Sequence, residues 1–150
     1  MCNSDNAKTL AAFREATREL DSIYALFPKS CELSEPEYWS LLLIYEGFVT
    51  QSQISEQLYF SRQTLNSAFK QLRKKGLVKL QPYEDNQRSK QAFLTESGKE
   101  FVKKNVLQMH KIEEKAWRGM SKEEHAALIE LTQKFTKLIL NQLNTSKSDN

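Results

Sequence analysis

The chain has 150 residues, of which 27% are Asp, Glu, Lys or Arg, and its formal net charge is +3 at pH 7. This length suits a single domain, and so small a net charge means that any preference for an anionic partner depends on where the basic residues lie. No stretch reaches the roughly 20 apolar residues that span a bilayer, and no apolar run resembles a signal peptide. The sequence therefore predicts a cytoplasmic protein without a membrane partner.

Residues 7–27 are predicted to form a helix that ends at Pro28, because proline does not continue a helix interior. The apolar positions of this helix recur at helical spacing and form one broad stripe: Leu10, Phe13, Leu20, Ile23, Tyr24 and Phe27. A second helix is predicted over residues 34–46. Ser34 is its N-cap, and the nearly continuous apolar run at 41–44 is typical of a buried central helix.

Residues 50–59 and 61–75 are predicted to form two helices with a short link, as in a helix-turn-helix. Ser61 is a good N-cap for the second of these helices, and Gly76 supplies the left-handed conformation that ends it. The segment 61–79 contains six Lys or Arg and no Asp or Glu. Such a segment favours a polyanion as the partner.

The second of these two helices is predicted to have two faces. Four residues at helical spacing face a core: Leu65, Ala68, Phe69 and Leu72. The opposite face is predicted to contact DNA, because amides and hydroxyls can read base edges and cations can neutralise phosphates. The expected contacts of this recognition helix are Ser61, Arg62, Gln63, Thr64, Asn66, Ser67, Lys70 and Lys74.

A β-hairpin is predicted directly after the basic helix, with the turn-rich residues 82–88 between its strands. Its position is that of a wing, and its expected DNA contacts are Arg88, Ser89 and Lys90. Arg88 can enter a minor groove, and Lys90 can meet a phosphate. The alternative is a solvated turn of mixed charge, because most turns of this composition are no more than that.

Residues 96–118 and 121–143 are predicted to form two further helices on either side of Gly119, and Ser121 with Glu124 forms a capping box for the second. Both helices carry apolar stripes, and a twofold partner is the commonest way of covering such stripes. The chain is therefore assigned one domain with three kinds of segment. They are dimerisation helices at about 7–33 and 97–144, a winged helix-turn-helix at about 34–96, and a flexible tail at 145–150.

Four segments have a familiar order and spacing: Ser61–Thr64, Leu72–Val78, Asp85–Lys90 and Leu94–Gly98. Together they resemble the MarR family of bacterial winged-helix transcriptional regulators. The resemblance implies a mainly α fold with a small β wing and an obligate homodimer. The target would be a pseudo-palindromic double-stranded DNA operator with half-sites roughly 10 base pairs apart. One position departs from the family pattern, because Asn86 stands where an Asp is common.

A regulator also needs an input, and the resemblance implies a small-molecule pocket near the first two helices. Aromatic side chains there could stack on a small aromatic or amphipathic effector. The candidate pocket residues are Phe13, Tyr24, Phe27, Trp39 and Tyr45. The alternative is that these rings belong to the core, as aromatic residues at helical spacing more often do.

Cys31 is the candidate redox residue, because some members of the family sense peroxides through a cysteine near the first helix. The neighbouring Glu32 and Glu35 would raise the pKa of its thiol, which favours the alternative of an ordinary reduced cysteine. His110, His125 and the cysteines lack the spacing of metal ligands, so no metal site is predicted. The sequence also has no nucleophile or phosphate-loop motif, so neither enzyme activity nor a cofactor is expected.

Two functions from different classes remain. The first is a homodimeric DNA-binding repressor under the control of an effector, with thiol-based redox sensing as a variant. The second is a winged-helix module that binds another protein. Six cations without a neighbouring acid favour the first function, and DNA binding should weaken steeply as salt rises, because phosphate contacts release counterions.

Overall fold

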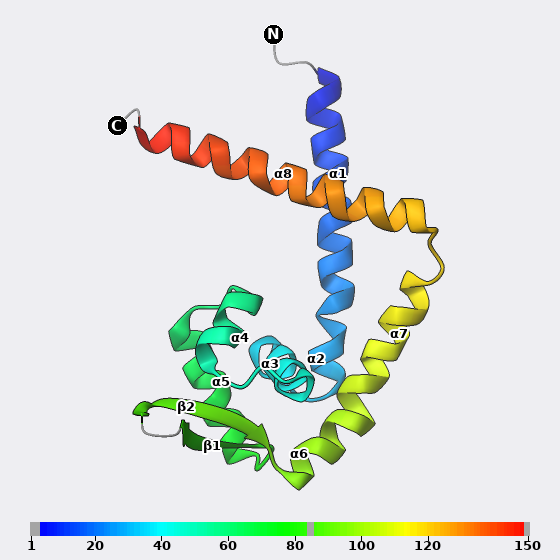
Figure 1. The fold of residues 1–150 in the computed structure, drawn as a ribbon. Coiled ribbons are helices and arrows are strands. Elements are labelled where there is room, and N and C mark those ends of the chain that lie inside the picture. Colours follow the sequence, from blue (N-terminus) through cyan, green and yellow to red (C-terminus); the bar gives the residue numbers. More distant parts are fainter. Residues whose placement is uncertain (1–3, 84–85, 149–150) are drawn as a thin grey trace. The chain divides into compact units, whose positions relative to one another are not determined.

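The structure is a computed structural model that describes residues 4–83 and 86–148, with side chains within 5–82 and 90–147. Two compact units divide between Met109 and His110. The first unit contains α1 (Ser4–Tyr24), α2 (Leu26–Ser30), α3 (Glu35–Glu46), α4 (Gln51–Leu58), α5 (Arg62–Lys74), β1 (Val78–Tyr83), β2 (Asn86–Leu94), α6 (Glu96–Phe101) and the π-helical turn η1 (Val102–Val106) (Figure 1). Helix α7 (Leu107–Trp117) crosses the division, and α8 (Lys122–Ser148) belongs to the second unit. The fold is mainly α with a small β wing, as predicted.

The predicted end of the first helix is wrong. Helix α1 ends at Tyr24, and Pro28 lies in the first turn of the short helix α2 instead of after the last turn of α1. A proline ring clashes with the carbonyl four residues before it, and that carbonyl belongs to Tyr24. The break therefore falls one turn earlier than predicted, and Pro28 occupies a position that needs no intrahelical N–H bond.

The predicted caps around the central helices are confirmed. The Ser34 N–H donates to a Glu37 carboxylate oxygen at 2.8 Å, and Gly47 ends α3 in the left-handed region with φ 105°. The Ser61 hydroxyl accepts from the Thr64 N–H at 3.1 Å at the start of α5. Gly76, with φ 71°, turns the chain from α5 into the wing.

The wing is an antiparallel hairpin in which Val78 pairs with Leu94 at the base. Its strands reach to Tyr83 and begin again at Asn86, so they extend into the segment predicted as a turn. The other edge of β2 is also held, because the Ala92 N–H donates to the Val49 carbonyl at 2.7 Å. The base of the wing is thus fixed to the residues that lead into α4.

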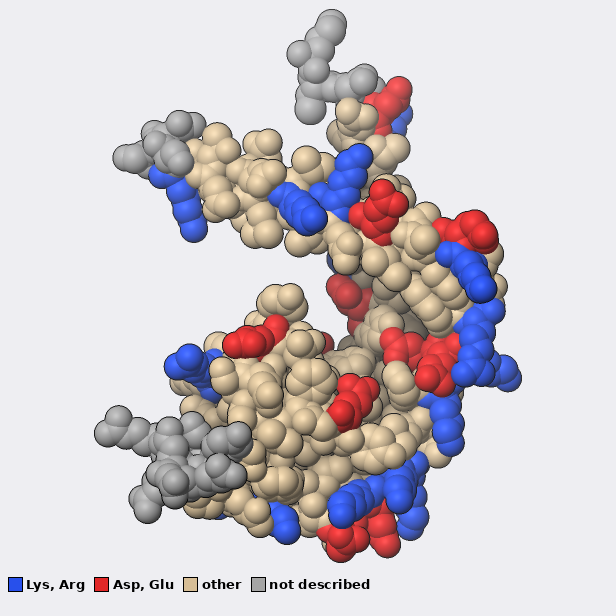
Figure 2. All heavy atoms as spheres, in the orientation of Figure 1, with Lys and Arg blue, Asp and Glu red and all other residues tan. Residues whose placement is uncertain are grey.

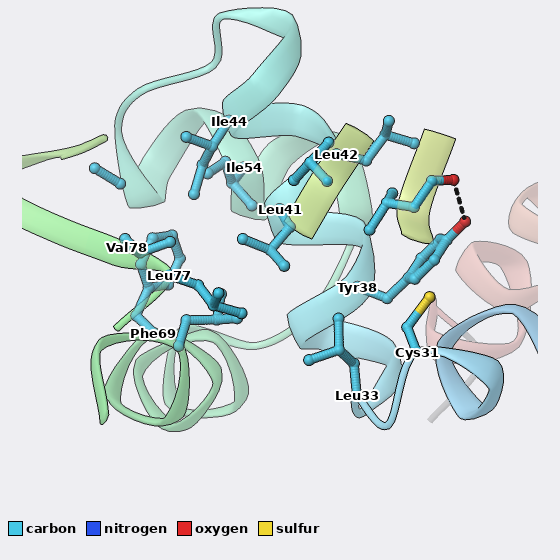
Figure 3. Packing of buried hydrophobic residues seen from close by; sticks show 14 of the residues in the cluster. Cys31, Leu33, Tyr38, Leu41, Leu42, Ile44, Ile54, Phe69, Leu77 and Val78 are labelled. Carbon is cyan, nitrogen blue, oxygen red and sulfur yellow. Dashed lines mark hydrogen bonds between the residues drawn. The ribbon is translucent and has the colours of Figure 1, made fainter. Parts of the chain in front are cut away.

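The core of the first unit surrounds α3, which confirms the prediction of a buried central helix (Figure 3). Helices α4 and α5, the base of the wing and η1 each add apolar side chains to this core. The most deeply buried of them are Tyr38, Leu41, Ile54, Leu65, Phe69, Leu72, Val102 and Val106. Because α5 gives its apolar face to this core, its polar face is left for solvent or a partner.

The segment predicted as one helix over 96–118 contains a π-helical turn, η1, between α6 and α7. Beyond it, α8 continues to Ser148, so residues 145–148 of the expected tail are helical. No Gly or Pro follows Gly119 in the sequence, and nothing local therefore ends this helix at Leu143. Within the described ranges, no helix is both long and apolar enough to cross a bilayer.

Candidate nucleic-acid interface

Helix α5 separates its two faces as the sequence predicts. Leu65, Ala68, Phe69 and Leu72 are buried. The predicted contact residues lie on the other side of the helix, where Thr64 is half-buried and the remaining ones are exposed: Ser61, Arg62, Gln63, Asn66, Ser67, Lys70 and Lys74. The helix thus presents amides, hydroxyls and cations on a surface that its own core leaves uncovered.

Two of the predicted contact residues also build the start of α5. The Ser61 and Thr64 hydroxyls lie 2.8 Å apart, and the Ser61 oxygen caps the helix. The turn before them is fixed by the Ser55 hydroxyl, which donates to the Phe60 carbonyl at 3.1 Å. The side chains of Arg62 and Gln63 therefore project from the first turn of a helix whose start is fixed by hydrogen bonds.

Helix α4 contacts the exposed face of α5 through one pair of amides. The Gln51 Nε2 donates to the Asn66 Oδ1 at 2.9 Å. Gln51 was not predicted to belong to the interface. The one sequence feature that could have indicated it is a polar side chain at the first position of α4. This pair lies in an open depression of about 380 Å³ lined by Thr50, Gln51, Ser52, Arg62, Leu65, Asn66 and Lys90.

Residues of the wing and of α5 line this depression together. Lys90 comes from β2 and Arg62 from α5, yet both line this one depression and both are exposed. The side chains of Arg88 and Ser89 lie outside the described residues, as do Asp85 and the side chain of Asn86. The described part of the interface therefore has one wing cation, Lys90, beside the N-terminal end of α5.

An ion pair between the buried Glu37 carboxylate and the partly exposed Lys75 anchors the other end of α5. The Lys75 Nζ lies 2.8 Å from a Glu37 carboxylate oxygen and donates to the Glu32 carbonyl at 3.4 Å. Burial alone would raise the pKa of Glu37, but the hydrogen bonds from Lys75 and from the Ser34 backbone hold this pKa below its usual value. The carboxylate thus joins the N-terminus of α3 to the C-terminus of α5. This link was not predicted from the sequence. The sequence feature that could have indicated it is Glu37 itself, which stands at the third position of the capping box.

The structure brings together only three of the five residues proposed for an effector pocket. The ring centres of Tyr24 and Phe27 are 5.4 Å apart, and those of Tyr24 and Trp39 are 6.2 Å apart. Tyr38 joins the same group and packs edge-on against Trp39 at 4.9 Å. These rings fill space with one another, as residues of a core do.

The other two proposed pocket residues lie elsewhere. Phe13 is 51% exposed on α1. Tyr45 lines a second depression, of about 500 Å³, beside the base of the wing. That depression also contains Phe93 and three lysines, Lys79, Lys99 and Lys103, so it combines aromatic surface with positive charge.

Cys31 is buried, with 7% of its surface exposed, and it belongs to the core. Burial raises the pKa of its thiol, although the Ser30 hydroxyl at 3.7 Å opposes the shift. A thiol with a raised pKa is a poor nucleophile. Among the described residues, no group of three or more His, Cys, Asp or Glu side chains is placed to hold a metal ion.

Comparison with known proteins agrees with this arrangement. A model of the MarR family matches residues 33–89. An uncharacterised HTH-type transcriptional regulator of Bacillus subtilis, YybA, is 30% identical over 123 residues, which are 81% of this chain and 82% of that protein. The matched stretch includes most of the chain, not the helix-turn-helix alone.

Solved structures have the same fold. NMB1585, a MarR family regulator from Neisseria meningitidis, superposes with a TM-score of 0.78 at 19% identity, covering 92% of this chain and 98% of that chain. A second structure concerns the regulation of DNA binding of Bordetella bronchiseptica BpsR by 6-hydroxynicotinic acid. It superposes with a TM-score of 0.67 at 16% identity, covering 84% of this chain and 91% of that chain.

Proposed function

Because this chain belongs to the MarR family of winged-helix transcriptional regulators, we propose that it is a homodimeric repressor that binds a pseudo-palindromic operator in double-stranded DNA. A small-molecule effector releases or retunes this binding. The observation that carries the proposal is the division of α5 into a buried apolar face and an exposed face of amides, hydroxyls and cations. A surface of this composition suits the major groove.

The contacts divide by their chemistry. Gln63 and Asn66 are exposed amides near the start of α5 and read base edges. Arg62, Lys70 and Lys90 neutralise phosphates. The depression that Arg62 and Lys90 line, between α5 and β2, receives the DNA backbone that runs between the major and the minor groove. The wing then reaches the minor groove with Arg88, as expected from the sequence.

Dimerisation is supported by apolar surface that the described chain leaves exposed. On α8, Leu131 is 62% exposed and Leu138 is 51% exposed, and on α1 Leu20 is 55% exposed. In Figure 2, the visible face of α8 is mostly uncharged surface, interrupted by a few basic and acidic side chains. Such stripes favour a second copy of the chain as their cover, and a twofold dimer favours an operator with twofold symmetry.

The effector site that we favour is the depression that contains Tyr45. Its volume of about 500 Å³ suits a small ligand. Its three lysines favour an anionic group on that ligand, and Tyr45 and Phe93 offer surface for an aromatic ring. BpsR, whose DNA binding is regulated by 6-hydroxynicotinic acid, gives a precedent for this kind of control and a first compound to titrate.

The test is a selection of bound sequences from random double-stranded DNA at about physiological salt, where specific and non-specific binding separate. We expect a palindrome, and its affinity should fall steeply as ionic strength rises. Lys70→Ala and Arg88→Ala should weaken binding to all sequences, whereas Gln63→Ala or Asn66→Ala should cost about 1 to 3 kcal/mol on the selected site alone. No enriched sequence, together with binding that ignores salt, would favour the protein-binding module instead.

A further inference from the structure

We infer that Gln51, the first residue of α4, sets the base preference of the recognition helix by fixing the orientation of the Asn66 carboxamide. The inference rests on the proposed DNA-binding function and adds a positioning residue to it. Its basis is the 2.9 Å hydrogen bond from the Gln51 Nε2 to the Asn66 Oδ1. This bond joins the two helices at the surface, inside the depression between α5 and the wing.

The backbone that carries Gln51 is held rigidly, so the bond is set before DNA arrives. Thr50 caps α4 by accepting from the Gln53 N–H at 3.2 Å, and the Gln53 side chain accepts from the Thr50 N–H at 3.0 Å. Thr50 is also bridged to Gln91 of the wing. A side chain that starts from such a fixed point can orient its partner at a low cost in entropy.

The hydrogen bond gives Asn66 a direction. A carboxamide has an acceptor oxygen at one end and a two-donor NH₂ group at the other. With the oxygen engaged by Gln51, the donor end of the carboxamide is the end that Asn66, an exposed residue of α5, can offer to a base. A recognition helix in the major groove would thus meet base edges with donors from this residue.

This direction predicts which bases Asn66 prefers. An unconstrained Asn pairs with adenine through both its ends, using N6 and N7. When its oxygen is already engaged, the donor end is best matched by guanine, which presents the two acceptors O6 and N7. We therefore expect guanine in the wild-type site at the position that Asn66 contacts.

Two substitutions of Gln51 separate this role from a merely structural one. Gln51→Ala frees the Asn66 oxygen and should move the preference at that position from guanine towards adenine. Gln51→Glu replaces the donor by a carboxylate, which can only accept from the Asn66 Nδ2 and so turns the Asn66 oxygen outward. That variant should favour a base with a donor edge, cytosine or adenine, while its added charge weakens binding to every sequence.

The experiment repeats the selection from random double-stranded DNA with the wild type, Gln51→Ala, Gln51→Glu and Asn66→Ala. Gln57→Ala, at an exposed glutamine of α4, is the control and should keep the wild-type motif. We expect a change of about tenfold in base preference at one position of each half-site, within the range for one good base contact. Asn66→Ala should lose the preference at the same position, and Gln51→Ala should change nothing further in that background.

The outcomes distinguish the inference from the function on which it rests. If the wild type selects no motif, the proposed function fails and the inference fails with it. If the wild type selects a motif that both Gln51 variants reproduce, the inference alone is overturned. It is also overturned if the variants alter several positions equally, because a positioning role predicts a change at one. Thermal unfolding of each variant identifies any loss of fold. If Gln51→Ala fails to fold, the base preference of Gln51→Glu tests the inference, because an acidic residue in the first turn of a helix is favourable to the fold.

Discussion

Thr95 and Gly98 join the end of α5 to α6, the helix that follows the wing. The Thr95 N–H donates to the Leu77 carbonyl at 3.1 Å, and its hydroxyl donates to the Gly76 carbonyl at 2.6 Å. The same hydroxyl accepts from the Gly98 N–H at 2.9 Å and so caps α6. These contacts give a physical reason for the Leu94–Gly98 segment by which the sequence resembles its family.

Gly98→Ala should destabilise the fold by about 1 to 3 kcal/mol, the usual cost of forcing atoms into a filled site. A Cβ at this position would overlap the backbone carbonyl of Leu77, and a backbone cannot give way as the end of a side chain can. Chemical denaturation measures the loss. Ser97→Ala, at the exposed neighbouring residue, should have little effect, and equal stability of Gly98→Ala and wild type would contradict the close approach.

Glu37 predicts a dependence of stability on pH. Its pKa in the folded protein is lowered, so its stabilisation is fully present above the pKa of the unfolded chain and is lost as pH falls through the folded pKa. Glu37→Gln should cost about 1 to 3 kcal/mol at neutral pH and less in acid, because it removes a charged hydrogen-bond partner. Unfolding curves at a series of acidic pH values measure the difference. Glu56→Gln, at an exposed residue of α4, should lack this effect, and a pH-independent loss in Glu37→Gln would refute the ionic role.

At the scale of elements, the helix after the wing is interrupted where it packs against the core. Val102 and Val106 are both fully buried, and the π-helical turn between them links α6 to α7. The Leu107 N–H donates to the Val102 carbonyl, five residues back, as a π-helix requires. Tyr38, on α3, donates its hydroxyl to the Val106 carbonyl at 3.3 Å and so fixes this turn to the centre of the fold.

Tyr38→Phe should therefore cost about 1 kcal/mol, because it removes a buried donor while keeping the ring. The ring contacts with Phe27 and Trp39 should survive the change. Thermal unfolding measures the loss, and hydrogen exchange of the amides around 102–107 should increase with it. Tyr59→Phe, at a residue that is 92% exposed, is the control. An unchanged stability would mean that the hydroxyl bond contributes nothing to the turn.

At the scale of the whole molecule, α8 carries apolar side chains that the described chain leaves uncovered. These exposed residues are Leu128, Ile129, Leu131, Phe135, Leu138, Ile139, Leu140 and Leu143. A monomer would have to keep this surface in water, whereas a dimer can bury it at about 25 cal/mol per Å². If α8 joins two copies of the chain in this way, the dimer has twofold symmetry, and a twofold-symmetric operator is expected to match it.

Leu138→Asp should shift the protein from dimer to monomer, because a carboxylate among these apolar side chains cannot be buried without a partner. Molar mass from light scattering across a range of concentrations measures the shift, and affinity for a selected palindrome should fall in parallel. Ser97→Asp adds the same charge at an exposed residue outside α8 and should leave the dimer intact. A wild type that is already monomeric at high concentration would rule out the dimer.

The sequence by itself determined the local features of this protein. Ser34, Ser61 and Gly76 carry their own conformational preferences, and the apolar spacing of α5 orients that helix by periodicity alone. The positions of the helices and the side of α5 that faces the core followed from these short-range rules. The family resemblance also rested on local sequence, because four short segments carry it.

Tertiary structure decided what depends on residues far apart in the chain. The Glu37–Lys75 pair and the Gln51–Asn66 bond arise only when helices pack, since no periodicity relates their partners. The same holds for the π-helical turn beside Tyr38 and for the packing of Tyr24 against Trp39. Local preference is a property of neighbours along the chain, whereas the choice of contact is made by the three-dimensional packing that brings distant side chains together.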